Sequence, residues 1–149
     1  MSASKRLLVL VGAAVTDVGE LPPSVRLLLD AADEVLVVTP TLTSKLEWIV
    51  SDTDKARHDA DERLATVLGQ LTSVDIAAQG AVGDDSPLTV VEDHVRAFVP
   101  DHLLIALRKT AHADWQERGL IENVVAEFNL PITVFAVDEE GRVGKPRPV

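Results

Sequence analysis

Short runs of consecutive apolar residues alternate along this chain with longer stretches in which apolar residues recur every three or four positions. A short solid run is typical of a strand covered on both faces, and the wider spacing is typical of an amphipathic helix. The pattern predicts five strands, over residues 7–11, 34–38, 74–78, 103–107 and 132–137.

The helical pattern falls between these strands. One helix is expected to begin at Pro22-Pro23-Ser24, one to end near Gln70, one to begin at Ser86-Pro87, and one to cover about 114–128. Because short helical crossovers join parallel strands, we predict a doubly wound, three-layer α/β sandwich. Its five-stranded parallel sheet should have the order 3-2-1-4-5, with helices on both faces.

Length and layout predict one domain, residues 1–138, followed by a tail, residues 139–149. The tail has no core pattern, so we expect it to be mobile or to lie along the surface. Ligands of such sheets bind at the carboxyl ends of the strands, beside the switch point between the first and fourth strands. The segments that bear on function are therefore 12–19, 39–41, 80–85 and 108–114.

Composition narrows the function classes. The chain has no cysteine, which suits a reducing cytoplasm and removes thiolate chemistry. A formal net charge of −10 repels phosphate backbones, so neither nucleic acid nor an anionic membrane is an expected partner. Lys5-Arg6 and the apolar run after them imitate a secretory signal, but the run is short and is interpreted as a buried first strand.

Strand lengths, helix positions, Gly83 and the unit from Asp101 to Val137 resemble the universal stress protein family over nearly the whole chain. Nucleotide-binding members carry, after the fourth strand, Gly, two residues, Gly, nine residues, Gly, then Ser or Thr. Laid without gaps on this chain, these positions are Ala106, Lys109, Gly119 and Leu120. Only Gly119 matches, so the resemblance implies a divergent member that lacks the usual ATP-binding motif.

Each departure has a physical meaning. Lys109 puts a long side chain where glycine lets backbone amides approach phosphate, and Leu120 replaces a hydroxyl that would bind it. After the first strand, where those members place an Asp that contacts the nucleoside, this chain has Gly12-Ala13-Ala14. We therefore expect no cofactor, with ATP or AMP as the ligands to test.

A second interpretation keeps an anion at the switch point. Arg108, Lys109, Thr110 and His112 follow the fourth strand and could bind phosphate through charge instead of amides. A degenerate nucleotide site would then comprise the residues Gly12, Gly83, Arg108, Lys109, Thr110 and Gly119.

No catalytic residue and no metal site is predicted. His112 has no serine or cysteine nucleophile placed beside it by any sequence signature. Asp84-Asp85 precedes Ser86-Pro87 and is interpreted as helix-start chemistry.

The favoured function is that of a non-enzymatic regulatory or binding protein in stress response. The alternative is a nucleotide-binding protein with a different phosphate site and weak ATP hydrolysis. The resemblance also implies a homodimer formed by antiparallel pairing of the last strand, with an interface at Ile132, Val134, Phe135 and Ala136. That strand would otherwise be an exposed apolar edge, which is an independent reason to expect the dimer.

Overall fold

A single six-stranded sheet organises the molecule. The computed structural model describes residues 5–12, 21–41, 54–83, 87–108, 120–138, 140 and 142–148. The sheet has the order β3-β2-β1-β4-β5-β6. Its strands are β1 (Arg6–Val11), β2 (Glu34–Pro40), β3 (Gln79–Gly83), β4 (His102–Arg108), β5 (Ile132–Val137) and β6 (Arg147–Pro148). The first five are parallel, which confirms the predicted fold class and strand order.

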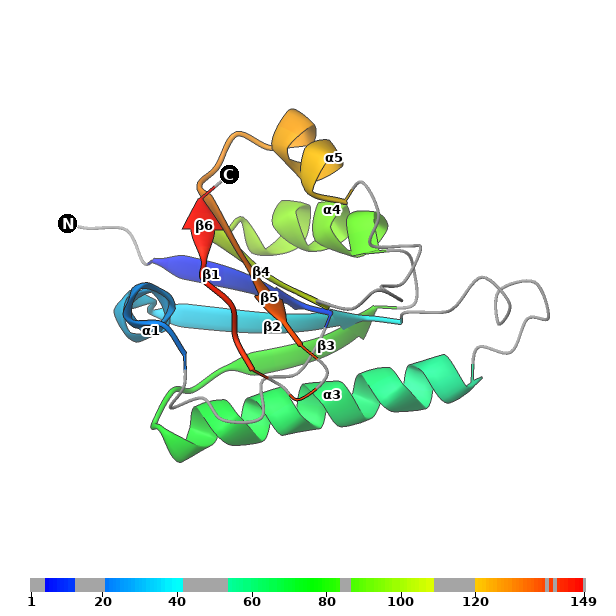
Figure 1. Cartoon of the computed structure of the whole chain (residues 1–149). Coiled ribbons are helices and arrows are strands. Elements are labelled where there is room, and N and C mark those ends of the chain that lie inside the picture. The colour runs from blue at the N-terminus through cyan, green and yellow to red at the C-terminus, as the bar shows by residue number, and fades with distance from the viewer. Residues whose placement is uncertain are drawn as a thin grey trace.

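Helices cover both faces of the sheet (Figure 1). They are α1 (Pro23–Ala31) and α3 (Asp54–Ser73) on one face, and α4 (Pro87–Phe98) and α5 (Leu120–Glu127) on the other. Neighbouring strand residues point to opposite faces, so β1 contributes Val9 to the core under α1 and α3, and Leu10 to the core under α4 and α5. The chain therefore has two cores that share one sheet.

The third strand lies later in the chain than predicted. Residues 74–78 were expected to form it, but α3 continues to Ser73, and Asp75 then takes a left-handed conformation with φ of 62°. The backbone N–H groups of Val74 and Ile76 both donate to the carbonyl of Leu71. The apolar residues of this segment close the end of α3 over the core instead of pairing in the sheet, so the strand begins only at Gln79.

The C-terminal segment, which was expected to be mobile or to lie along the surface, pairs with the edge of the sheet. Residues 142–148 turn back along β5, with an isolated bridge between Val137 and Val143 and an antiparallel pair between Thr133 and Pro148. The outer edge of β5, which was expected to pair with a second copy of the chain, is therefore paired within the chain.

The residues expected at a dimer interface have mostly internal contacts. Ile132, Val134 and Phe135 are each less than 5% exposed and belong to the two cores, and Ala136 is half-buried. A second copy that paired with β5 would have to do so through backbone groups. The homodimer itself stays a prediction.

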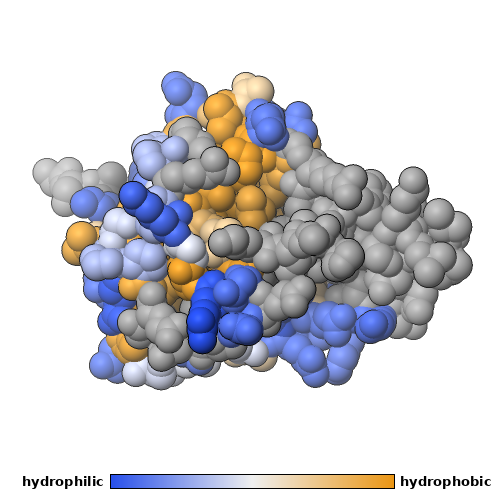
Figure 2. All heavy atoms as spheres, in the orientation of Figure 1, coloured by the Kyte–Doolittle hydropathy of each residue, from blue (hydrophilic) through white to orange (hydrophobic). Residues whose placement is uncertain are grey.

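The surface is unevenly polar. On the face shown in Figure 2, hydrophilic side chains follow α3, whereas hydrophobic side chains gather beside α5 and β6. Val125 of α5 is 46% exposed. Within the described ranges, no helix is both long enough and apolar enough to span a bilayer.

Candidate functional site

The carboxyl ends of the strands bring several of the predicted site residues to one edge of the sheet. Gly12 follows β1 and its N–H donates to the carbonyl of Ala106 in β4 at 2.8 Å. Gly83 ends β3, and Arg108 ends β4. Lys109, Thr110 and Gly119 lie outside the described residues, as do His112 and Asp84-Asp85. The structure thus places the predicted edge but only half of the predicted site.

Two buried threonines join the strands at this edge. Thr39 is fully buried, and its hydroxyl lies 3.5 Å from the carbonyl oxygen of Val11. Thr41 donates twice to the carbonyl of Gly83, from its backbone N–H at 2.9 Å and from its hydroxyl at 2.7 Å. These hydroxyls, which lie in a segment singled out from the sequence, hold β1, β2 and β3 together.

Gly83 has a packing role that accounts for its lack of a side chain. A Cβ added there would lie 2.4 Å from Cγ2 of Val90, far inside van der Waals contact. Val90 belongs to α4 and is 2% exposed, so it has no room to withdraw. Glycine lets α4 pack closely over the end of β3.

Arg63 brings a positive charge to this edge and was missed in the sequence. It projects from α3, is half-buried, and donates from Nη2 to the carbonyl of Pro40 at 2.9 Å. The signal was its spacing: Arg63 lies three residues after the fully buried Ala60 and four before Val67, on the apolar side of α3.

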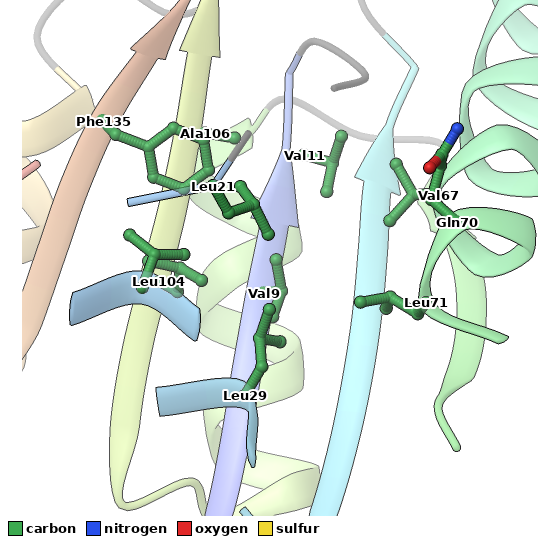
Figure 3. A pocket seen from close by; sticks show the side chains of 11 residues that line it. Val9, Val11, Leu21, Leu29, Val67, Gln70, Leu71, Leu104, Ala106 and Phe135 are labelled. Carbon is green, nitrogen blue, oxygen red and sulfur yellow. The ribbon is translucent and has the colours of Figure 1, made fainter. Parts of the chain in front are cut away.

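An apolar cavity of about 50 Å³ lies beneath the edge, between the sheet and α1 and α3 (Figure 3). Side chains from β1, β4 and β5 form its floor, and Leu21 and α1 lie opposite them. Among the described lining residues, Gln70 alone is polar; the others are Val9, Val11, Leu21, Val25, Leu29, Val67, Leu71, Leu104, Ala106 and Phe135. Such a lining offers dispersion contacts but hardly any partner for a sugar or a phosphate.

Two of the four family motif positions can be located. Ala106 lies inside β4, between Val11 of β1 and Phe135 of β5, and is 2% exposed. Leu120 is the first residue of α5, is also 2% exposed, and packs in the core under α4 and α5. Both are structural core positions in this chain.

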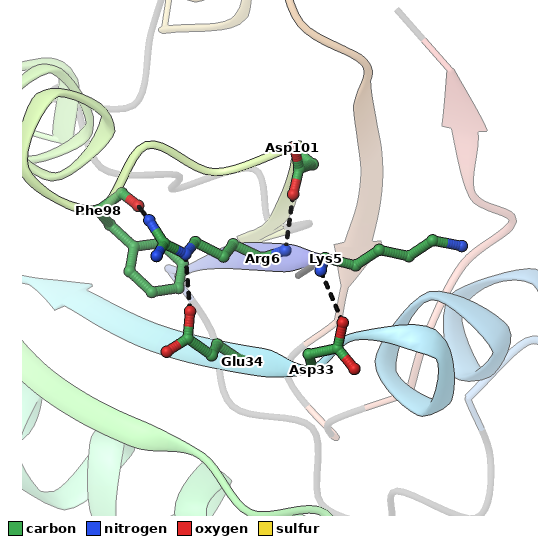
Figure 4. Close-up of polar contacts among 6 residues, drawn as sticks. All are labelled: Lys5, Arg6, Asp33, Glu34, Phe98 and Asp101. Carbon is green, nitrogen blue, oxygen red and sulfur yellow. Dashed lines mark hydrogen bonds and ion pairs between the residues drawn. The ribbon is translucent and has the colours of Figure 1, made fainter. Parts of the chain in front are cut away.

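The amino-terminal ends of the strands carry a different kind of contact (Figure 4). Arg6 donates from Nε to a carboxylate oxygen of Glu34 at 2.7 Å. The backbone N–H groups of Lys5 and Arg6 donate to the carboxylates of Asp33 and Asp101 at 2.7 and 2.9 Å. These exposed charged contacts join the starts of β1, β2 and β4.

His102 lies at the same end, where its Nε2 is 2.9 Å from the hydroxyl of Thr133. Burial lowers the pKa of His102 from its ordinary value of 6.5, so the ring is neutral at pH 7. In the part of the chain that the structure describes, no group of three or more histidine, aspartate and glutamate side chains is arranged to bind a metal.

Comparison with known proteins agrees with this architecture. No family model and no curated protein sequence matches the chain. Among solved structures it is similar to a universal stress protein family protein from Arabidopsis thaliana with AMP bound, at 11% identity and a TM-score of 0.56. The match covers 91% of this chain and 94% of the other. At that identity the likeness shows that this chain has the fold of a universal stress protein over nearly its whole length.

Proposed function

We propose that this protein is a non-enzymatic regulatory or binding protein of the universal stress protein type, acting in stress response, and that it does not bind ATP in the usual way of nucleotide-binding members. The proposal rests on the similarity of fold together with the contacts of the described part of the ligand edge. The observation that carries the proposal is the burial of the Leu120 side chain at the start of α5.

Leu120 stands where the motif requires a hydroxyl. Its side chain is packed in the core with Val91 of α4 and Val124 of α5, at a helix terminus, where the first N–H groups lack partners within the helix and would otherwise suit a phosphate. Glu122, in the first turn of the same helix, is exposed and adds a negative charge there. A carboxylate interacts favourably with the positive end of the helix dipole and repels a phosphate, so both residues disfavour ATP.

The apolar cavity and Ala106 above it support the same conclusion. Ala106 is held inside β4 by pairing on both sides, so its backbone is engaged in the sheet. The cavity below it is lined almost wholly by hydrocarbon. A nucleoside would meet few of the polar partners that fix its orientation in a pocket.

Arg63 favours a second candidate function, the binding of an anionic ligand with weak ATP hydrolysis. Its guanidinium lies at the carboxyl end of β2, where it donates to Pro40. Together with Arg108 and Lys109, it would supply charge in place of glycine amides. The solved neighbour binds AMP, which makes AMP and ATP the first anions to test.

A calorimetric titration of the full chain with ATP and Mg²⁺, repeated with AMP, separates the two candidates. We expect no measurable heat of binding at ligand concentrations up to about 1 mM, corresponding to less than about 4 kcal/mol of binding free energy. Micromolar binding with one ligand per chain would contradict the proposal.

If ATP or AMP binds, a matched pair of variants tests whether Arg63 contacts it. Arg63→Gln removes the charge at the ligand edge, whereas Arg57→Gln removes the same charge from an exposed position on the same helix. Weaker binding in the first variant alone would establish the charge-based site. Equal effects would mean that only the overall charge matters.

A further inference from the structure

The C-terminal segment forms a built hairpin with β5. The N–H of Asp138 donates to the carbonyl of Arg142 at 3.0 Å, and the N–H of Gly144 donates to the carbonyl of Ala136 at 2.8 Å. One carboxylate oxygen of Asp138 accepts from the N–H groups of Glu140 and Arg142, each at 2.9 Å. A side chain that caps its own turn in this way fixes the direction in which the chain returns.

The register of the hairpin changes along its length. Val137 faces Val143, and further along Val134 faces Arg147. Between these two pairs the C-terminal segment has three residues, 144–146, where β5 has two, 135–136. One extra residue on one strand is a β-bulge, a feature that bends an edge strand and interrupts its ladder.

Proline ends the sheet at β6. Pro148 faces Thr133, and because proline has no N–H, that pair cannot exchange two hydrogen bonds. In the alternation of an antiparallel ladder, Val134 and Arg147 then form the hydrogen-bonded pair. The nitrogen of Pro148 faces away from β5, where it has no hydrogen to offer another strand. β6 therefore covers one edge and does not create an equivalent one.

The strand under this cover is suited to pairing with itself. β5 reads Ile-Thr-Val-Phe-Ala-Val, with no charge, proline or glycine, and such a segment pairs readily when its edge is open. Hydrophobic side chains also gather on the surface beside α5 and β6 (Figure 2), next to this edge. Antiparallel pairing of two β5 strands would give a symmetric interface that continues onto this apolar surface.

We propose that residues 142–148 are an intramolecular cover for β5, and that a second copy of this chain pairs with β5 only when the cover is displaced. The full chain is then a monomer at rest, and its association depends on opening the hairpin. This inference is independent of whether the protein binds a nucleotide.

Cysteine cross-linking in the full chain tests where β6 lies. The natural chain has no cysteine, so Thr133→Cys with Pro148→Cys introduces a single facing pair. Non-hydrogen-bonded pairs have Cα atoms about 4.5 Å apart, within reach of a disulfide. We expect an internal disulfide and a species of 16.0 kDa on a non-reducing gel. A disulfide-linked dimer at low micromolar concentration would overturn the proposal, and each single-cysteine variant serves as control.

Sedimentation equilibrium of four full-length proteins tests the competition: the wild type, Asp138→Ala, the disulfide-locked protein and the control Asp59→Ala. Asp138→Ala removes two hydrogen bonds from an exposed turn, where water replaces part of each, so the open population should rise by about fivefold. Dimer should then form at a concentration at least about fivefold lower than in the wild type, while the disulfide-locked protein stays monomeric. Asp59→Ala, at an exposed site on α3, controls for the lost charge.

Any one of three results would contradict the proposal that the C-terminal segment covers β5. They are a wild-type dimer at concentrations where the double-cysteine variant is a monomer with an internal disulfide, self-association of Asp138→Ala no stronger than that of Asp59→Ala, and dimerisation of the locked protein. Circular dichroism of each variant shows that the fold is retained, so a change in mass is assigned to the edge and not to unfolding.

Discussion

The two ends of the parallel sheet are held together by different chemistry. At the carboxyl end, the hydroxyls of Thr39 and Thr41, and Gly83 against Val90, make uncharged contacts, and the half-buried Arg63 adds one charged contact to the carbonyl of Pro40. At the amino end, the contacts around Lys5 and Arg6 are charged and exposed, as in the ion pair of Arg6 and Glu34, whose side chains are 42% and 53% exposed. Breaking a buried contact lowers the free energy of unfolding more than breaking an exposed ion pair does.

This difference bears on function, because the carboxyl end is where the fold binds ligands elsewhere. In this chain the described part of that end is occupied by contacts that stabilise the sheet. A residue such as Gly83, which would attract attention as a candidate ligand contact, is already explained by the approach of α4. The main effect of substitutions at this end should therefore be a loss of stability, and not a loss of ligand binding.

The largest effect is expected for Gly83→Ala. The new Cβ would lie 2.4 Å from Cγ2 of the buried, branched Val90, so α4 or β3 must move. Such overpacking should lower the free energy of unfolding by about 2 kcal/mol, measured by urea denaturation.

Two other glycines serve as controls for that substitution. At Gly80 an added Cβ meets the ends of Leu64 and Leu68 at 2.9 and 2.8 Å, which are side chains able to shift, so Gly80→Ala should cost less. At Gly69, inside α3, nothing lies within 4 Å, and alanine should stabilise the helix by about 0.5 kcal/mol. Equal costs at positions 80 and 83 would contradict the role given to Val90.

An intermediate effect is expected for Thr41→Val, which keeps the shape of the side chain and removes its hydroxyl. The lost bond to the carbonyl of Gly83 is 2.7 Å long and the residue is 7% exposed. Unfolding free energy should fall by about 1 kcal/mol, while the carbonyl keeps the N–H of Thr41.

The matched control for Thr41→Val is Thr66→Val on α3. The hydroxyl of Thr66 also donates to a carbonyl, that of Glu62, at 3.0 Å, but at an exposed site where water can replace it. A loss at position 66 as large as at position 41 would show that burial is not the cause.

The sequence predicted correctly those parts of the molecule in which apolar residues form continuous runs. The apolar runs of β4 and β5 located both strands, and the parallel direction of the first five strands followed from the helical crossovers between them. β3 was misplaced because Val74 and Ile76 are apolar in order to close a helix, while the edge strand itself reads Gln-Gly-Ala-Val-Gly. Local hydropathy cannot distinguish these two uses of an apolar residue.

The candidate site was less predictable for a related reason. A pattern locates the ends of strands, but it does not say which groups there are already engaged, as Thr41 and Gly83 are with each other. Arg63 could be found only by noticing that a charged residue occupied an apolar helix position. The hairpin of β6 depends on a turn bond of Asp138 and on two-residue pairing, neither of which leaves a periodic signal.

The smallest effect is expected at the amino end of the sheet, for Glu34→Gln. This change removes the charge of the pair with Arg6 but keeps a side chain able to accept a hydrogen bond. Because the pair is exposed, the free energy of unfolding should fall by no more than about 0.5 kcal/mol, and the difference should vanish in about 1 M salt. Arg6 retains its bond to the carbonyl of Phe98 at 3.1 Å, which limits the loss further. Urea denaturation of Glu34→Gln and Thr41→Val at low and high salt tests this difference between the two ends. If Glu34→Gln lowered the free energy of unfolding as much as Thr41→Val, and if this decrease persisted in high salt, the comparison would be wrong. Charged contacts at the amino end would then stabilise the sheet as strongly as buried ones at the carboxyl end.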